Sequence, residues 1–78
     1  MRIDWKEHID AKPEILFGKP VIKDTRIPVD LIIEKLSFGE SIEELLEAYP
    51  RIKREQVLAC LSFALASLRN EEMYLLAS

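Results

Sequence analysis

Three basic residues, Arg51, Lys53 and Arg54, lie together in the segment RIKR of this 78-residue chain. Guanidinium and ammonium groups bind phosphates, and at the start of a helix they can also approach base edges in the major groove of DNA. The cluster therefore predicts a DNA contact. The alternative is a solvated basic corner, because Glu55 follows at once. The formal net charge of -3 argues against a protein whose whole surface binds nucleic acid.

Catalytic chemistry has few candidate residues. An enzyme needs a nucleophile with a base, a carboxylate pair facing a cleft, or metal ligands at suitable spacing. His8 is the only histidine and is expected to face solvent, while Glu43, Glu44 and Glu47 are expected on the solvated face of a short helix. Cys60 lies in the apolar pattern QVLACLSFALASL, which is typical of a buried structural thiol. We therefore expect no enzymatic activity, no cofactor and no metal site.

Apolar residues late in the chain predict a surface for a partner protein. One long helix is expected over about residues 53–76, and its apolar stripe extends past what two short helices can cover. The residues expected to face the core are Val57, Leu61, Ala64, Leu65 and Leu68. The residues expected to point away from the core are Leu58, Ala59, Ser62 and Phe63. The residues predicted to bind a partner are Leu58, Leu68, Arg69, Tyr74, Leu75 and Leu76. The alternative is a stripe that folds entirely into its own monomer.

The N-terminal part of the chain predicts a small β-hairpin. In KPVIKDTRIPV two short β-branched runs flank Asp24 and Thr25, which are residues typical of a tight turn. Pro28 suits the position just before a helix. Apolar residues with helical spacing then predict a first helix over residues 29–38, which ends at Gly39.

Cap signals predict the second helix. Ser41 and Glu44 have the spacing of a capping box, and Pro50 closes the segment. With the long helix that follows, the fold class is mainly α: a small N-terminal β-hairpin followed by a trihelical helix-turn-helix core with a long third helix. We expect a single domain over residues 1–78, divided into an N-terminal segment, 1–28, and a helical core, 29–78.

Composition adds expectations about location and assembly. The start MRIDWKEHID lacks the apolar run of a signal peptide, and no stretch approaches about 18 consecutive apolar residues. We therefore expect a cytoplasmic protein with no membrane partner. A chain of 78 residues has a marginal core, so a homodimer is expected, through the third helix or through a hairpin edge.

The motifs GKPVI, TRIPV, GES and YP occur in this order along GKPVIKDTRIPVDLIIEKLSFGESIEELLEAYPRIKREQVLACLSFAL. In this order and spacing the chain resembles the bacterial domain of unknown function 433 family over about residues 9–65. The resemblance implies a homeodomain-like helix-turn-helix fold. It also implies an antitoxin-like protein that neutralises a PIN-like nuclease toxin and binds its own promoter DNA. The alternative is a free-standing helix-turn-helix regulator, or a protein-interaction module without a toxin.

Three positions depart from the family's usual pattern. Phe17 stands where a second glycine is common, and its ring is expected to pack against the core. Asp24 replaces the usual turn glycine, which is expected to leave the turn unchanged at a small cost in strain. Lys53 replaces a threonine able to cap the third helix, so that this helix start is expected to lose a cap.

The resemblance also suggests how a toxin would be inhibited. PIN-like nucleases are implied to hold a divalent metal with several carboxylates, and a cation can compete for such an acidic cleft. Arg69 is the only cation in SLRNEEMYLLAS, so we expect its guanidinium to take this role. The rival interpretation is an ordinary helical ion pair with Glu72, three residues on.

Overall fold

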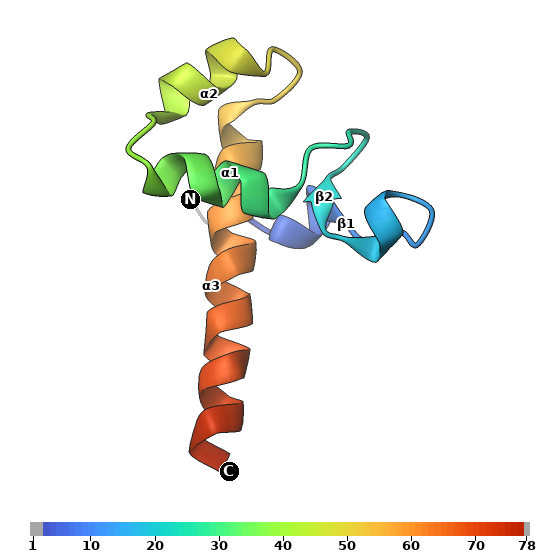
Figure 1. The fold of residues 1–78 in the computed structure, drawn as a ribbon, viewed down its shortest axis with the longest axis vertical. Coiled ribbons are helices and arrows are strands. Elements are labelled where there is room, and N and C mark those ends of the chain that lie inside the picture. The colour runs from blue at the N-terminus through green and yellow to red at the C-terminus, as the bar shows by residue number, and fades with distance from the viewer. Residues whose placement is uncertain (1–2, 78) are drawn as a thin grey trace.

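The computed structural model describes the backbone of residues 3–77 and the side chains of residues 3–70. The elements in chain order are the 3-10 turn η1 (Trp5–Glu7), strand β1 (Ile9–Asp10), the 3-10 turn η2 (Leu16–Gly18), strand β2 (Val21–Ile22) and the helices α1 (Val29–Ser37), α2 (Ile42–Ala48) and α3 (Arg54–Ala77). The described chain is thus mainly helical, with a short antiparallel strand pair before the helices, which confirms the predicted fold class. In Figure 1, α1 crosses α3, and the C-terminal half of α3 projects past the other elements.

The two strands pair over a short antiparallel register. Ile9 lies opposite Ile22, and Asp10 lies opposite Val21. On its other side Val21 forms a bridge with Pro28, and the Val29 N–H donates to the carbonyl of Pro20 at 3.0 Å. The strand β2 therefore has a partner on both sides. The sequence predicted the pairing with residues 27–29 and missed the pairing with β1.

The predicted turn at Asp24 and Thr25 is confirmed. The Thr25 hydroxyl donates to the carbonyl of Ile22 at 2.7 Å and accepts from the Ile27 N–H at 3.0 Å. The Thr25 N–H also donates to the carbonyl of Ile22, at 3.0 Å. Asp24 adopts φ +62°, in the left-handed region that aspartate tolerates better than most residues. One threonine side chain thus closes the turn from both ends.

A second left-handed segment lies in η2. Leu16, Phe17 and Gly18 have φ values of +48°, +57° and +84°. The Phe17 side chain is fully exposed, and η2 contains no buried residue. The expectation that the Phe17 ring packs against the core is therefore wrong. The left-handed backbone turns this connection outward, so the ring at its tip has nothing to pack against.

The end of α1 and the start of α2 follow the predicted signals. At the end of α1 the Gly39 N–H donates to the carbonyl of Leu36 and the Glu40 N–H donates to that of Lys35, at 3.0 and 3.1 Å. Gly39 has φ +94°, so these two bonds form the Schellman arrangement that commonly ends a helix at glycine. Ser41 then caps α2, which begins at the next residue.

The start of α3 is capped in a different way from α2. The Gln56 side chain accepts from the Lys53 N–H at 2.8 Å, which satisfies one backbone donor at the helix start. The expected loss of a cap at Lys53 is thus partly compensated by the residue three positions later. Among the described residues, α3 is not apolar enough along its length to cross a membrane, and the other helices are too short.

The core lies where the N-terminal half of α3 meets α1, α2 and the strand pair. Its largest fully buried side chains include Ile22, Ile32 and Leu45, one from the sheet and one from each short helix. The buried residues of this cluster are Ile9, Ile22, Val29, Ile32, Leu45, Ile52, Val57, Ala59 and Cys60. Every element except η2 contributes to it or packs against it, so that the strand pair and the helices form one folded unit.

Candidate protein-interaction surface

The helix α3 carries a row of large apolar side chains that remain exposed in the described part of the chain. Leu58, Leu61, Leu65 and Leu68 retain 38%, 42%, 47% and 62% of their exposure. Their spacing of three, four and three residues places them in one row along the helix. We call this row the outward leucine face. It gives the surface of α3 the apolar character expected at a contact between proteins.

The prediction of which residues of α3 face the core is largely wrong. Leu61, Leu65 and Leu68 were expected in the core and are exposed, whereas Ala59 was expected outside and is fully buried. Phe63, also expected outside, packs on the core and meets the Trp5 ring edge-on, with ring centroids 4.9 Å apart and planes at 83°. The helix is apolar on two sides, so its periodicity alone does not identify the side that packs.

A groove lies between α1 and α3. It encloses about 600 Å³, and we call it the α1–α3 groove. Its apolar lining consists of Pro20, Val29, Ile33, Phe63, Ala64 and Leu68. Its polar lining consists of Lys19, Asp30, Glu34, Ser37 and Ser67. At its mouth the Lys19 ammonium lies 2.8 Å from the Asp30 carboxylate, and both side chains are largely exposed.

Of the predicted partner-binding residues, Leu68 borders both the groove and the outward leucine face, and Leu58 lies on that face. The groove could not be recognised in the sequence, because the residues that line it come from segments far apart in the chain. Its one usable signal was local: Val29 and Ile33 are four residues apart, which puts them on one side of α1.

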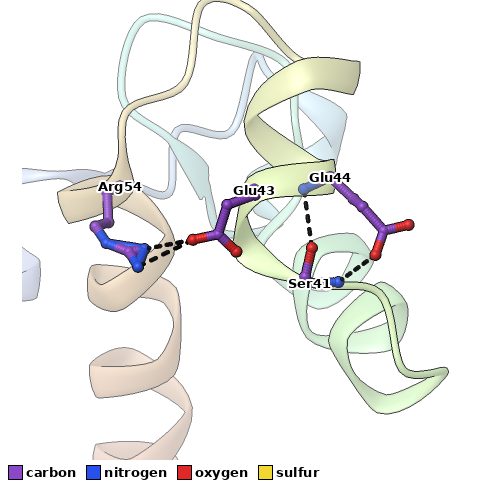
Figure 2. Close-up of polar contacts among 4 residues, drawn as sticks. All are labelled: Ser41, Glu43, Glu44 and Arg54. Carbon is purple, nitrogen blue, oxygen red and sulfur yellow. Dashed lines mark hydrogen bonds and ion pairs between the residues drawn. The ribbon is translucent and has the colours of Figure 1, made fainter.

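The three predicted DNA-binding residues are all exposed, and Arg54 and Arg51 have different neighbours. The Arg54 guanidinium contacts the Glu43 carboxylate of α2 at 3.2 Å, beside the capping box of Ser41 and Glu44 (Figure 2). Arg51 instead lines a hollow of about 340 Å³ near the turn of the strand pair. The other basic residues that line this hollow are Lys12 and Arg26. Asp10 and Asp24 line it too, and the Lys12 ammonium lies 3.9 Å from the Asp10 carboxylate, so the three basic residues share this hollow with two acidic ones.

The capping box in Figure 2 has both of its hydrogen bonds. The Glu44 N–H donates to the Ser41 hydroxyl at 3.1 Å, and the Ser41 N–H donates to the Glu44 carboxylate at 3.0 Å. The bond from the Ser41 N–H, and after it the Ser41 side chain, stabilise the charged form of Glu44 and lower the pKa of its carboxyl group. The box fixes the start of α2, from which Glu43 reaches Arg54. The three glutamates of this helix remain exposed, as predicted.

At the other end of the described side chains, Arg69 is exposed. It lines a hollow of about 470 Å³ with residues 3–6 and with Ser62, Leu65 and Ala66 of α3. The predicted partner-binding residues Tyr74, Leu75 and Leu76 lie outside the residues whose side chains the structure describes, as does Glu72.

Cys60 and His8 are the two side chains considered above as possible reactive groups. Cys60 is fully buried, as predicted, and burial raises the pKa of its thiol to about 12. A thiol that stays protonated is a poor nucleophile, so this position contributes packing. His8 is half-buried, where exposure was expected, and its carbonyl accepts from the Lys23 N–H at 2.8 Å. The backbone of His8 therefore helps to hold β1 beside β2.

This geometry defines the class of the protein: a trihelical domain with a short strand pair and an open apolar groove. The sequence model of the family described as "Protein of unknown function (DUF433)" matches residues 9–64. That match covers most of the chain, and the chain belongs to the DUF433 family. The sequence resemblance is thereby confirmed.

Two other proteins are similar to this chain, one in sequence and one in structure. "Uncharacterized protein y4eO" of Sinorhizobium fredii (strain NBRC 101917 / NGR234) is 36% identical over 52 residues, which are 67% of this chain and 24% of that protein. A crystal structure of a DUF433 member from Anabaena variabilis ATCC 29413 superposes with a TM-score of 0.74 at 26% identity, covering 85% of this chain and 65% of that one. The chain thus spans about a quarter of the first relative and under two thirds of the second.

Proposed function

We propose that this DUF433 protein is a non-enzymatic protein-binding module that neutralises a PIN-like nuclease toxin. The observation that supports the proposal is the α1–α3 groove, which combines an apolar floor with a polar rim. Interfaces between proteins have this anatomy, and grooves between helices commonly accept an amphipathic helix of a partner. The nuclease class comes from the family resemblance, which implies an antitoxin-like role.

The chemistry of the groove assigns a role to each part. Burial of Phe63 and Ile33 under a partner helix would supply most of the binding free energy, because these side chains are apolar and only half-buried. The exposed Lys19 and Asp30 pair at the mouth contributes little affinity by itself and sets the orientation of a charged partner. Arg69, beyond the groove, is the cation that would reach the carboxylates of the nuclease.

A groove-filling substitution tests the proposal. Ser37 lies at the exposed rim, so that Ser37→Trp would occupy the groove without disturbing the core. We expect this variant to lose inhibition of a co-expressed PIN-like nuclease that the wild type inhibits. The matched control is Glu47→Trp, an exposed position on α2 outside the groove, which should inhibit as the wild type does. Equal inhibition by both variants would remove the groove from the interface.

The role of Arg69 is tested separately. Arg69→Ala should restore nuclease activity within an assembled complex, because it removes the charge that competes for the metal-binding carboxylates and leaves the groove intact. Co-purification measures assembly, and cleavage of RNA measures activity. Full inhibition by Arg69→Ala at matched complex concentration would mean that the inhibitor acts by steric occlusion.

DNA binding is the second candidate function. The observation that favours it is the hollow where Arg51 lies with Lys12 and Arg26, three basic residues against the two aspartates Asp10 and Asp24. If promoter DNA binds here, reversing the charge of Arg51, Lys53 and Arg54 weakens binding and reduces its salt dependence by about one unit per lost phosphate contact. Because Arg54 is already engaged by Glu43, we expect Arg51→Glu to account for most of the loss. Unchanged binding by the triple variant would exclude the start of α3.

A further inference from the structure

The outward leucine face has an internal symmetry in its spacing. Leu58 and Leu68 lie five residues before and after position 63, and Leu61 and Leu65 lie two residues before and after it. If two copies of α3 lie antiparallel with their positions 63 at the same level, Leu58 of one copy faces Leu68 of the other. In the same arrangement Leu61 faces Leu65. We propose that α3 pairs with α3 of a second copy of this chain in this antiparallel register.

The charged residues beside the leucine row agree with this register. Leu58, Leu61, Leu65 and Leu68 have the spacing of a and d positions in a heptad, and both Glu55 and Arg69 then fall at e positions on one side of the row. In the antiparallel pair each Glu55 lies beside Arg69 of the other copy, which gives two pairs of opposite charge. Both side chains are exposed. In a parallel pair they would be separated by fourteen residues, or roughly 21 Å along the helix.

The centre of the proposed pair can be closely packed. Ser62 and Ala64 flank the leucines at the symmetry point, and both side chains are small. Small residues allow two helices to approach at the short end of the usual interaxial distances, about 8 Å. The leucines then fill the space between the two helices. Such an interface is isologous, since the same residues contribute from both copies.

Several features of this chain make a second copy the occupant of this face. Any row of four a and d positions has this symmetric spacing, so the discriminating feature is the charge match: a partner of another sequence would not need a Glu55 and an Arg69 placed to face each other across two copies of this helix. The strand β2 already has partners on both sides, so it offers no open edge to a second copy, and the remaining edge of β1 is only two residues long. The proposed pair shares Leu68 with the α1–α3 groove and Arg69 with the proposed inhibition of the nuclease. The test at Leu61 and Leu65 uses neither of these residues, so its outcome does not depend on the nuclease.

Charged substitutions at facing positions test the register. Leu61→Lys and Leu65→Glu each place a charge opposite a leucine, so each variant alone should sediment as a monomer of 9.0 kDa at concentrations where the wild type is a dimer. Mixed together, the two variants should form a one-to-one heterodimer, because the introduced lysine of one chain then faces the introduced glutamate of the other. The remaining facing positions keep their leucine pairs. Native mass spectrometry with a mass-tagged partner measures the heterodimer.

Two controls keep this test independent of folding. All the substituted residues are exposed, so circular dichroism should show unchanged helix content for each variant. Phe38→Lys, which changes an exposed aromatic residue at the end of α1, should remain a dimer. A wild type that is monomeric up to about 100 µM, the upper end of the range expected for weak association, would overturn the inference. A mixture that forms no more dimer than each variant alone would also overturn the inference. That result is expected of a parallel pair, in which the two introduced charges do not face each other.

A charge exchange at the ends of the pair gives a finer test. Glu55→Arg and Arg69→Glu should each weaken dimerisation by about three- to tenfold, because each creates two like-charge pairs. The double variant restores both pairs with reversed sign, and its dissociation constant should return to near that of the wild type. A double variant as weak as the weaker single one would show that these residues do not face each other.

Discussion

The two sides of α3 differ in the size of their apolar residues and in what covers them. The buried side presents Val57, Ala59 and Cys60 to the core, whereas the outward side presents a row of leucines to solvent. The fully buried residues of α3 are all smaller than leucine, and α1, α2, β1 and η1 all contact this helix. Close approach favours small residues, and larger apolar residues remain available for contacts with other chains.

In a small domain, hydrophobicity alone therefore does not identify which face of a helix packs on the core. A leucine buries more apolar area than an alanine, yet Ala59 is buried here and Leu65 is half exposed. A helix that is apolar on both sides shows a weak periodic signal, and the packing of the other elements decides which side is covered.

The largest effect on stability should come from a charged residue on the buried side of α3, compared with the same change on its outward side. Val57→Asp buries a carboxylate with no partner, and we expect it to lower the free energy of unfolding by about 4 kcal/mol or more. The matched change Leu65→Asp, at an exposed position, should cost less than about 1 kcal/mol. Denaturant unfolding at low protein concentration measures both without a contribution from self-association. Similar losses for the two variants would contradict the assignment of the faces.

A smaller effect should come from the ring contact beside the buried face. Phe63→Ala removes the edge-on contact with Trp5, and we expect a loss of about 2 kcal/mol because Phe63 is only half-buried. Trp5 fluorescence in the folded state should shift toward that of an exposed indole. The control is Phe38→Ala, an exposed aromatic whose removal should change stability by less than about 0.5 kcal/mol.

Alkaline pH should reveal the buried side of α3 through Cys60, the one cysteine of the chain. The pKa of Cys60 is raised from 9.0 to about 12 in the folded protein, so between these values the unfolded chain releases a proton that the folded protein keeps. The free energy of unfolding therefore decreases as the pH rises above 9.0, by up to about 1.4 kcal/mol per pH unit. Cys60→Ala should show a shallower decrease. Moving the thiol outward, as Leu61→Cys in the Cys60→Ala background, should not restore the slope.

The smallest effect on stability should come from the cap at the start of α3, which belongs to neither the buried nor the outward side of the helix. Gln56→Ala removes the acceptor of the Lys53 N–H, and we expect a loss of about 0.5 to 1 kcal/mol. Gln56→Glu keeps an acceptor at this position and should retain most of the stability. Self-association measured by sedimentation should be unchanged in both variants. A change in dimerisation would link the cap to the outward leucine face.

The features that the sequence predicted correctly depend on neighbours in the chain. Ser41 and Glu44 are three residues apart, Gly39 follows its helix directly, and Asp24 with Thr25 forms a turn through bonds to nearby backbone groups. Such contacts form wherever the local sequence allows them, so the helix limits could be assigned to within a residue or two.

The features that the sequence did not predict depend on contacts between distant segments. Ile9 becomes part of a strand because it lies opposite Ile22, and two residues of strand carry too little pattern to be recognised alone. The α1–α3 groove and the joining of Arg51 with Arg26 have the same origin. Phe17 was misplaced because the outward turn of its connection depends on three consecutive left-handed residues.

The contact between Trp5 and Phe63 has a consequence for the order in which the chain folds. It joins a residue near the start of the sequence to the first half of α3, so forming it closes most of the chain into a loop. Closing so long a loop costs more entropy than forming the turns between the helices, and helices themselves form within about a microsecond. We therefore expect the N-terminal segment to dock last, onto helices that have already collapsed. Because Trp5 is the only tryptophan, its fluorescence follows this final step alone, and its kinetic phase should lag behind the appearance of helical circular dichroism.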